Sequence, residues 1–203
     1  MDRPTILKKV QARMSDLMPG TQIEVNSQSL SDVLLDDCAD TFYMRLPTNV
    51  LPATDFSNGT ASSYSSDEVL VKRLLVPSEF IRLVSFKVSD WRKSVNTTIP
   101  EGSDKHKLQF SKYTYGGKSR PVVTLVSGSS NDRNIEYYLP LGSTATVTTA
   151  TCVVKGSVEL MPDTLIDAFT WYVASVVLLA NQEVEAAKAA SSKVDEFIAL
   201  HQQ

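Results

Sequence analysis

The chain has 203 residues, of which 42% are hydrophobic and 21% charged, a balance typical of folded globular proteins. Its net charge of −3 and pI near 5.4 argue against a sequence-specific nucleic-acid-binding domain. Two cysteines, Cys38 and Cys152, are too few for a disulfide framework, and no basic segment followed by an apolar run opens the chain. We therefore expect buried thiols and no secretory signal.

Two helices are predicted in the first 46 residues. Pro4 suits a first helical turn, and apolar residues then recur every three or four positions: Leu7, Val10, Met14 and Leu17. Ser29 or Ser31 is expected to cap the second helix, which Pro47 ends. The predicted apolar face of this second helix consists of Val33, Leu34, Cys38, Phe42 and Leu46.

Residues 47–67 are polar and show no hydrophobic period, most clearly in the run from Ser57 to Ser66. A structureless segment of this length is uncommon in a compact domain. We expect an extended loop or arm here, which is either mobile or ordered by a neighbouring molecule.

The middle of the chain, residues 68–160, is predicted to be rich in strands. Val84, Phe86 and Val88 alternate with polar residues, which is the period of a half-buried strand. Further strands are predicted at Val69–Leu75, Arg120–Val126, Ile135–Leu139 and Thr146–Lys155. The segment Lys105–Tyr113 fits either a short helix or a strand.

The segment from Pro162 to Gln203 is predicted to form two long helices with a break near Asn181. Apolar residues recur at helical spacing in the first of them: Leu165, Phe169, Tyr172, Val173, Val176 and Leu179. The apolar run Leu165–Ala180 has 16 residues, which is short for a membrane span of about 20 residues. We interpret it as a buried helix, followed by an Ala-rich, partly solvated helix that ends near Leu200.

These elements predict an α+β fold, in which a helical bundle of two N-terminal and two long C-terminal helices is interrupted by a β-rich insertion. We expect residues 1–46 and 161–203 to form the bundle, 47–67 the loop or arm, and 68–160 the insertion. The net charges of 1–46, 47–67, 68–160 and 161–203 are −2, −2, +5 and −4. Oppositely charged parts could pack within one subunit or make head-to-tail contacts between subunits.

The sequence contains no motif typical of catalysis, cofactor binding or metal binding. Gly116–Ser119 lacks the first glycine of a phosphate-binding loop. Of the two histidines, His201 lies at the C-terminal end, and His106 is interpreted as an exposed loop residue rather than part of a catalytic triad. One carboxylate cluster is interpreted as a solvated helix face: Asp36, Asp37 and Asp40. We predict no catalytic residue, no cofactor and no metal.

Basic and aromatic residues are interleaved between positions 105 and 120. The basic residues are Lys105, Lys107, Lys112, Lys118 and Arg120, and the aromatic ones are Phe110, Tyr113 and Tyr115. Such mixtures bind phosphates and stack on bases in proteins that hold single strands. We interpret this predicted basic cluster as a surface that faces either a neighbouring subunit or, through weak and non-specific contact, DNA.

Several segments resemble one family of viral proteins. The residues that carry the likeness are Pro77–Leu83 and the strand after it, Trp91, Gln109, Tyr113, Gly116 and Arg120–Val122, together with the Ala-rich helical pair after Leu165. They resemble head-to-tail connector proteins of tailed bacteriophages, also called adaptor or ring proteins, and most closely the ring proteins of crAss-like phages.

The resemblance implies a helical bundle with a β insertion, assembled as a closed dodecameric ring beneath the portal, with DNA passing through its lumen. It implies a structural virion protein at the head–tail junction, made in the host cytoplasm, that binds copies of itself, the portal protein and other connector or tail proteins. It implies neither enzymatic activity nor a membrane. The residues alone leave two alternatives open: a soluble carboxylate-dependent hydrolase and a non-viral oligomeric scaffold protein.

Overall fold

The computed structural model of the protein describes residues 1–19, 25–128, 132–155, 158 and 161–202. This part of the chain contains five α-helices and two β-sheets, which confirms the predicted α+β fold class. The chain divides into two compact units, each described by itself below. The helical unit comprises Met1–Pro52 and Lys155–Gln203, and the β unit comprises Ala53–Val154.

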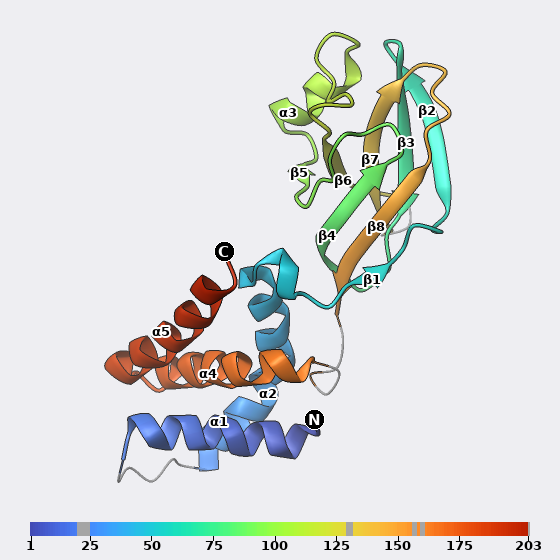
Figure 1. Ribbon diagram of the computed structural model, residues 1–203. Helices are drawn as coiled ribbons and strands as arrows, with labels where there is room; N and C mark the ends of the chain where they lie inside the picture. Colours follow the sequence, from blue (N-terminus) through green and yellow to red (C-terminus); the bar gives the residue numbers. More distant parts are fainter. Residues whose placement is uncertain (20–24, 129–131, 156–157, 159–160, 203) are drawn as a thin grey trace. The chain divides into compact units, whose positions relative to one another are not determined.

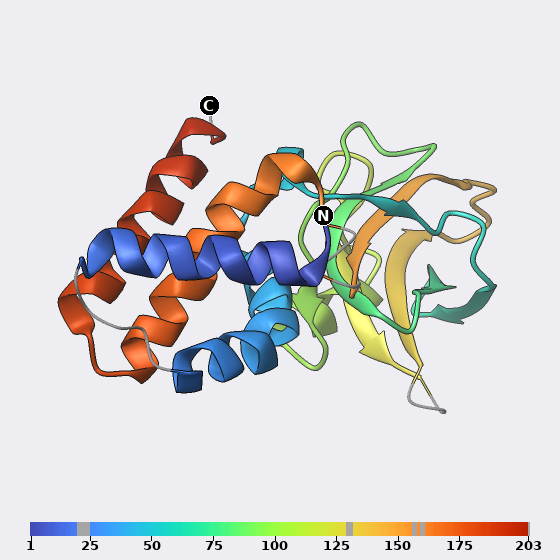
Figure 2. The ribbon, with the colours of Figure 1, turned by 90° about the horizontal axis from the view of Figure 1, so that it is seen from below.

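The helical unit is built around α4. Its helices are α1 (Arg3–Leu17), α2 (Val25–Arg45), α4 (Asp163–Ala180) and α5 (Val184–Leu200), with a 3-10 turn at Thr48–Val50. Helix α4 packs against each of the other three helices, as its neighbours in Figures 1 and 2 illustrate. It supplies ten buried residues to the core, because apolar and small side chains surround most of its circumference. The Phe42 and Phe169 rings meet at a centroid distance of 5.5 Å.

The predicted break after α4 is confirmed, but the apolar faces differ in detail from prediction. Gln182 separates α4 from α5 with a φ of 65°. Val33 on α2 is 72% exposed and Leu179 on α4 is 60% exposed, whereas Leu35 is fully buried. The buried face of α2 follows helical spacing from Leu35 and includes Cys38, Ala39, Phe42 and Leu46. The apolar pattern of the sequence predicted Val33 on this face, but on a helix a residue two positions from Leu35 points to another side.

Helix α2 begins at Val25, so the predicted capping position at Ser29 or Ser31 was wrong. Ser31 lies inside the helix and its side chain is buried. Serine in a helix interior competes with the backbone for hydrogen bonds, which is why it suggested a boundary.

Two sheets form the β unit (Figure 1). One has the order β1-β8-β4 and the other β2-β3-β7-β6-β5; among the described strands β5 and β6 pair in parallel and the other pairs are antiparallel. The strands are β1 (Thr54–Asp55), β2 (Ala61–Ser66), β3 (Val69–Leu75), β4 (Phe80–Val88), β5 (Ile99–Pro100), β6 (Val123–Ser127), β7 (Arg133–Pro140) and β8 (Val147–Val154). Each strand predicted from the sequence is present: β3 has the predicted bounds, and the others differ at one or both ends.

The sheets share one apolar core. Phe86 of the three-stranded sheet packs on Tyr137 of the five-stranded sheet at 5.2 Å, and Trp91 contacts both rings. Because side chains alternate along a strand, the opposite face of the five-stranded sheet carries Arg73, Glu136 and Tyr138 instead. A short helix, α3 (Asp104–Lys107), and the 3-10 turn Leu108–Phe110 lie against this second face.

The loop predicted at 47–67 was wrong for much of its length, because the segment contains β1 and β2. Strand β2 pairs in regular antiparallel register with β3, from Ala61 opposite Leu74 to Ser66 opposite Val69. All its side chains are exposed or half-buried, so no alternation of polar and apolar residues marks it. The pairing partner β3, rather than local sequence, specifies this strand.

Candidate functional site

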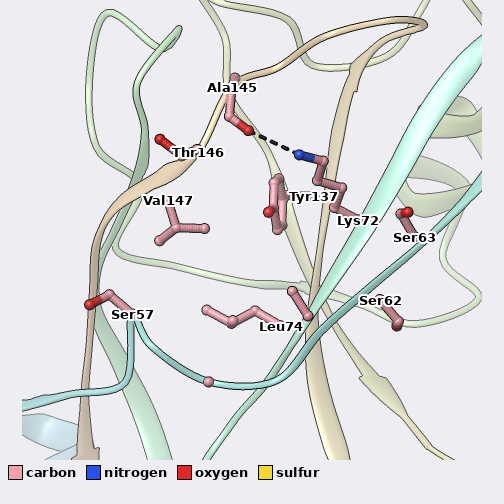
Figure 3. Close-up of a pocket in the computed structure, with 11 residues that line it drawn as sticks. Ser57, Ser62, Ser63, Lys72, Leu74, Tyr137, Ala145, Thr146 and Val147 are labelled. Atoms are coloured by element: carbon pink, nitrogen blue, oxygen red, sulfur yellow. Dashed lines mark hydrogen bonds between the residues drawn. The ribbon is translucent and has the colours of Figure 1, made fainter.

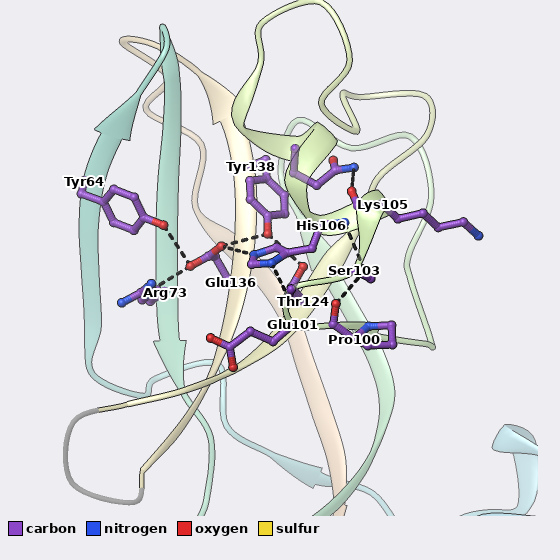
Figure 4. Close-up of polar contacts among 12 residues, drawn as sticks. Tyr64, Arg73, Pro100, Glu101, Ser103, Lys105, His106, Thr124, Glu136 and Tyr138 are labelled. Carbon is purple, nitrogen blue, oxygen red and sulfur yellow. Dashed lines mark hydrogen bonds and ion pairs between the residues drawn. The ribbon is translucent and has the colours of Figure 1, made fainter.

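A buried polar cluster centred on Glu136 lies between the second face of the five-stranded sheet and α3 (Figure 4). The Glu136 carboxylate is 1% exposed and accepts four hydrogen bonds. Tyr64 Oη (3.1 Å) and Arg73 Nε (2.9 Å) donate to Oε2. His106 Nε2 (3.1 Å) and Tyr138 Oη (2.9 Å) bond to Oε1. These contacts join β2, β3, β7 and α3 through a single carboxylate.

The position of His106 corrects the sequence interpretation. His106 is 9% exposed and lies in α3. Ser103 caps this helix, because its side-chain oxygen accepts a hydrogen bond from the His106 backbone N–H. The Gly102 N–H donates to His106 Nδ1 at 3.0 Å, so Nδ1 is an acceptor and Nε2 carries the proton that goes to Glu136. The Lys-rich flanks predicted exposure, but the lysines point outward while the histidine between them points inward.

Electrostatics favour an ionised Glu136. Burial alone would raise the pKa of this carboxyl, but the hydrogen bonds from His106, Arg73 and Tyr138 and the Arg73 charge together hold the pKa below its ordinary value. Burial raises the pKa of Tyr138 above its ordinary value, so its hydroxyl stays protonated and remains a donor. The cluster is therefore a carboxylate with a guanidinium counterion and neutral donors.

The polar groups of this cluster are bonded to one another and are not placed to act on a substrate. Thr124 Oγ1 is hydrogen-bonded to the Tyr138 hydroxyl at 2.8 Å, so neither hydroxyl is directed at an open site. The Nδ1 lone pair of His106 is occupied by the Gly102 N–H, and a general base needs a lone pair within reach of substrate. The arrangement holds α3 on the sheet, and we assign it a structural role.

The structure separates the predicted basic cluster into parts that pair with different elements. Lys107 pairs with Asp104 in α3 (3.3 Å), and Lys112 pairs with Glu68 in the β2–β3 turn (2.6 Å). Lys118 pairs with Asp90 (3.5 Å) and also accepts, through its carbonyl, the Arg92 N–H (2.9 Å). Lys105 and Arg120 are exposed and have no ion pair among the described residues.

The backbone hydrogen bond between Arg92 and Lys118 brings together a basic patch that was not predicted from the sequence. It consists of Arg92, Lys93, Lys118 and Arg120, and Asp90 forms an ion pair with Lys118. Arg92 and Lys93 are exposed. They lie 25 or more positions from Lys118 along the chain, so only the fold brings them together. No local signal in the sequence could have joined them.

Residues that carry the family resemblance occupy packing positions in the β unit. Gln109 is buried: its Nε2 donates to the Lys105 carbonyl (2.8 Å) and its Oε1 accepts the Gly116 N–H (2.6 Å). A Cβ on Gly116 would lie 2.6 Å from the Arg120 carbonyl oxygen, so glycine is required there. Trp91 is 3% exposed. These residues maintain the fold of the insertion and do not form a reactive site.

One hollow in the described part of the β unit is open to solvent and uncharged except for one lysine (Figure 3). Its volume is about 390 Å³, and its walls include Leu74, Tyr137 and Val147 with serine hydroxyls at the rim. The Lys72 ammonium on its edge donates to the Ala145 carbonyl at 3.0 Å. Nothing in this set of side chains activates a nucleophile.

Carboxylates predicted to form a solvated helix face are half-buried or exposed on α2. Asp36 pairs with Arg3 (3.2 Å) and Asp40 with Lys155 (3.3 Å). Among the described residues no three His, Cys, Asp or Glu side chains are grouped closely enough to hold a metal ion. By length and composition α4 could cross a membrane, but 56% of it is buried inside the structure, as in core helices of globular proteins.

The chain matches no model of a known protein family, and no curated protein matches it.

Proposed function

We propose that the protein is a structural subunit of a closed ring in the head-to-tail connector of a tailed bacteriophage. In this proposal the helical unit is a bundle of two N-terminal and two C-terminal helices, and the β unit is its insertion. The ring, a dodecamer, binds the portal protein and other connector or tail proteins at the head–tail junction of the virion, and DNA passes through its lumen.

The observation that carries the proposal is the way the chain enters and leaves the β unit. Residues Ala53–Val154 form one compact unit, and the segments on either side of it form the other. Entry and exit are adjacent, since Thr54 of β1 pairs with Cys152 of β8. A helical unit interrupted by a β insertion is the layout that the resemblance to connector proteins implies.

Packing of the resembling residues is a second support. Trp91, Gln109 and Gly116 each hold a specific contact within the insertion. Residues of this kind preserve a fold, whereas a family defined by chemistry would share side chains at an open site. The proposal therefore rests on a shared architecture and not on a shared reaction.

Solution mass tests the proposal. The purified chain, alone and mixed with the portal protein from the same virus, should form a closed ring of uniform mass in native mass spectrometry, and electron micrographs should show a central channel. A chain that remains monomeric or dimeric under both conditions would contradict a ring subunit. Ring formation without portal binding would favour a non-viral scaffold protein instead.

A carboxylate-dependent hydrolase is the alternative, and the Glu136–His106 contact is the pair of groups that would have to carry its reaction. A catalytic carboxylate must reach substrate, yet Glu136 is 1% exposed and already accepts four hydrogen bonds. The hydrolase proposal predicts that Glu136→Gln abolishes turnover of an ester, phosphoester or glycoside substrate in a folded protein. Loss of stability without any such turnover in the wild type would rule it out.

A further inference from the structure

Two exposed apolar residues project from the segment that covers the second face of the five-stranded sheet. Leu108 is 52% exposed and Tyr113 is 85% exposed. The basic tip, as we name this surface, consists of these two residues with Lys105, Lys107 and Lys112. Aromatic side chains are enriched in surfaces that bind a partner.

The basic tip is held firmly from beneath. His106 bonds to Glu136, and the Phe110 ring packs edge-on against Tyr138 at 5.9 Å. Thr114 Oγ1 donates to the Leu108 carbonyl at 2.5 Å, which folds residues 111–114 back onto the 3-10 turn. Because the inward side chains fix the segment, the outward ones present a preformed surface, and a partner need not order it on binding.

A second exposed apolar surface lies in the helical unit, at the turn between α4 and α5. The acidic turn, as we name it, runs from Leu179 to Glu185, and all seven residues are exposed. It includes Leu179 (60% exposed) and Val184 (45% exposed) beside the carboxylates of Glu183 and Glu185. These two apolar side chains are therefore accessible to a partner.

The two surfaces are complementary in charge. The β unit carries 12 Lys/Arg and 9 Asp/Glu, a net charge of +3, whereas the rest of the chain carries 8 and 14, a net charge of −6. Locally, Lys107 and Lys112 pair with exposed carboxylates, and Lys188 pairs with Glu185. With these partners included the basic tip has a charge of +1 and the acidic turn −1, so charge sets orientation and apolar burial supplies affinity.

We propose that the acidic turn of one copy binds the basic tip of the next copy. The contact is heterologous, since it joins two different surfaces, and repeated contacts of this kind close a ring when the rotation per step allows it. The inference rests on the proposed function, which needs a contact between neighbouring subunits but does not specify one. Leu179 and Val184 of one copy then pack against Leu108 and Tyr113 of its neighbour.

Charge reversal in two variants tests the contact. One variant carries Lys105→Glu, Lys107→Glu and Lys112→Glu, and the other carries Glu183→Lys and Glu185→Lys. Each variant alone brings like charges together at every contact, so its association constant should fall at least about tenfold at low salt. An equimolar mixture should recover assembly, because copies that alternate around a ring again join opposite charges.

The matched control is Arg92→Glu/Lys93→Glu/Arg120→Glu. It changes net charge by as much as the tip variant does, within the same unit, but at a basic patch without large exposed apolar residues. It should assemble like the wild type. All variants should keep the wild-type melting temperature as monomers, since every altered side chain is exposed.

Several results would overturn the inference. Unchanged assembly of the tip variant or the turn variant, loss of assembly in the control alone, or a mixture that fails to recover would each refute this contact. A tip variant that forms normal rings but loses binding to a DNA oligonucleotide would show that nucleic acid is the partner of the tip. Wild-type rings with unaffected variants overturn the contact alone, whereas a wild type that never assembles overturns the ring function as well.

Discussion

The helical unit and the β unit accommodate charged residues in different ways. In the helical unit the ion pairs lie at the surface, as between Arg45 and Asp195, whose side chains are 39% and 62% exposed. In the β unit a carboxylate is 1% exposed and fixes four partners. Surface pairs contribute little to stability, while a buried carboxylate is costly unless every lone pair is satisfied. The helices thus depend on apolar packing, whereas the second face of the sheet combines a small apolar cluster with one buried polar cluster.

The largest effect should come from a charge in the core of the helical unit. Phe169 is fully buried against Phe42, so Phe169→Asp should leave the unit unfolded, at a cost above about 4 kcal/mol. Leu179→Asp, on the same helix but 60% exposed, is the matched control and should change stability by about 0.5 kcal/mol or less. Urea unfolding followed by circular dichroism measures both. A folded Phe169→Asp protein would show that this face of α4 is not core.

Removing the buried charge should have the next largest effect. Glu136→Gln leaves Arg73 without its counterion, and we expect a loss on the order of 3 kcal/mol. The loss stays at the lower end for such pairs because the Arg73 side chain is 37% exposed and water can solvate it. Glu101→Gln is the control, because Glu101 is exposed and accepts one backbone N–H at 2.9 Å. Equal losses in both variants would contradict a special role for the buried cluster.

A smaller effect is expected from added volume behind the basic tip. Gly116→Ala places a methyl group 2.7 Å from a Val122 methyl and 2.6 Å from a carbonyl oxygen, and overpacking of this kind costs about 1–3 kcal/mol. Gly117→Ala is the neighbouring control, since its Cβ would meet nothing closer than 3.9 Å. Thermal unfolding should separate the two variants, and indistinguishable melting temperatures would refute the close approach at Gly116.

The buried carboxylate also predicts a pH dependence. The folded-state pKa of Glu136 is lowered, so its stabilising contribution is complete above the ordinary value of 4.5 and is lost as the pH falls through the lowered folded value. The facing groups are Arg73, His106, Tyr64 and Tyr138. Wild-type stability should therefore fall more steeply with pH below about 4.5 than that of Glu136→Gln. Parallel curves from urea unfolding between neutral and acidic pH would contradict an ionised Glu136.

The smallest effect is expected at a surface pair of the helical unit. Asp195→Asn keeps the shape of the side chain but removes its charge next to Arg45, 2.9 Å away. We expect a loss of about 0.5 kcal/mol or less, which salt should reduce further. A loss comparable to that of Glu136→Gln would mean that the two units do not differ as described.

Features set by periodicity were predicted well from the sequence, and features set by contacts between distant segments were not. The α+β class, the break near Asn181 and the strand at Val69–Leu75 follow from local patterns of apolar residues. Strand β2 has no such pattern, because its pairing with β3 specifies it. His106 was assigned to the surface because its neighbours are lysines, whereas Glu136, 30 positions later, draws it inward.

The candidate site was predicted least well. The predicted basic cluster assumed that residues near in sequence share a surface, but Lys112 pairs with Glu68 and Lys118 contacts Arg92. No rule of local spacing links position 92 to position 118. A single sequence also gives no indication that Tyr64, Arg73 and Tyr138 converge on one carboxylate, since each comes from a different strand.

The β unit, which the pairing of β1 with β8 closes, is synthesised before the C-terminal half of the helical unit. A ribosome completes Ala53–Val154 before it reaches α4, so every strand of the β unit is available first. Helices α1 and α2 must wait for α4, against which both pack. Synthesis of the intervening segment of roughly one hundred residues takes on the order of 5–20 s. During this interval Phe42 lacks Phe169, the ring against which it packs, so the faces of α1 and α2 that α4 covers stay exposed until α4 is synthesised.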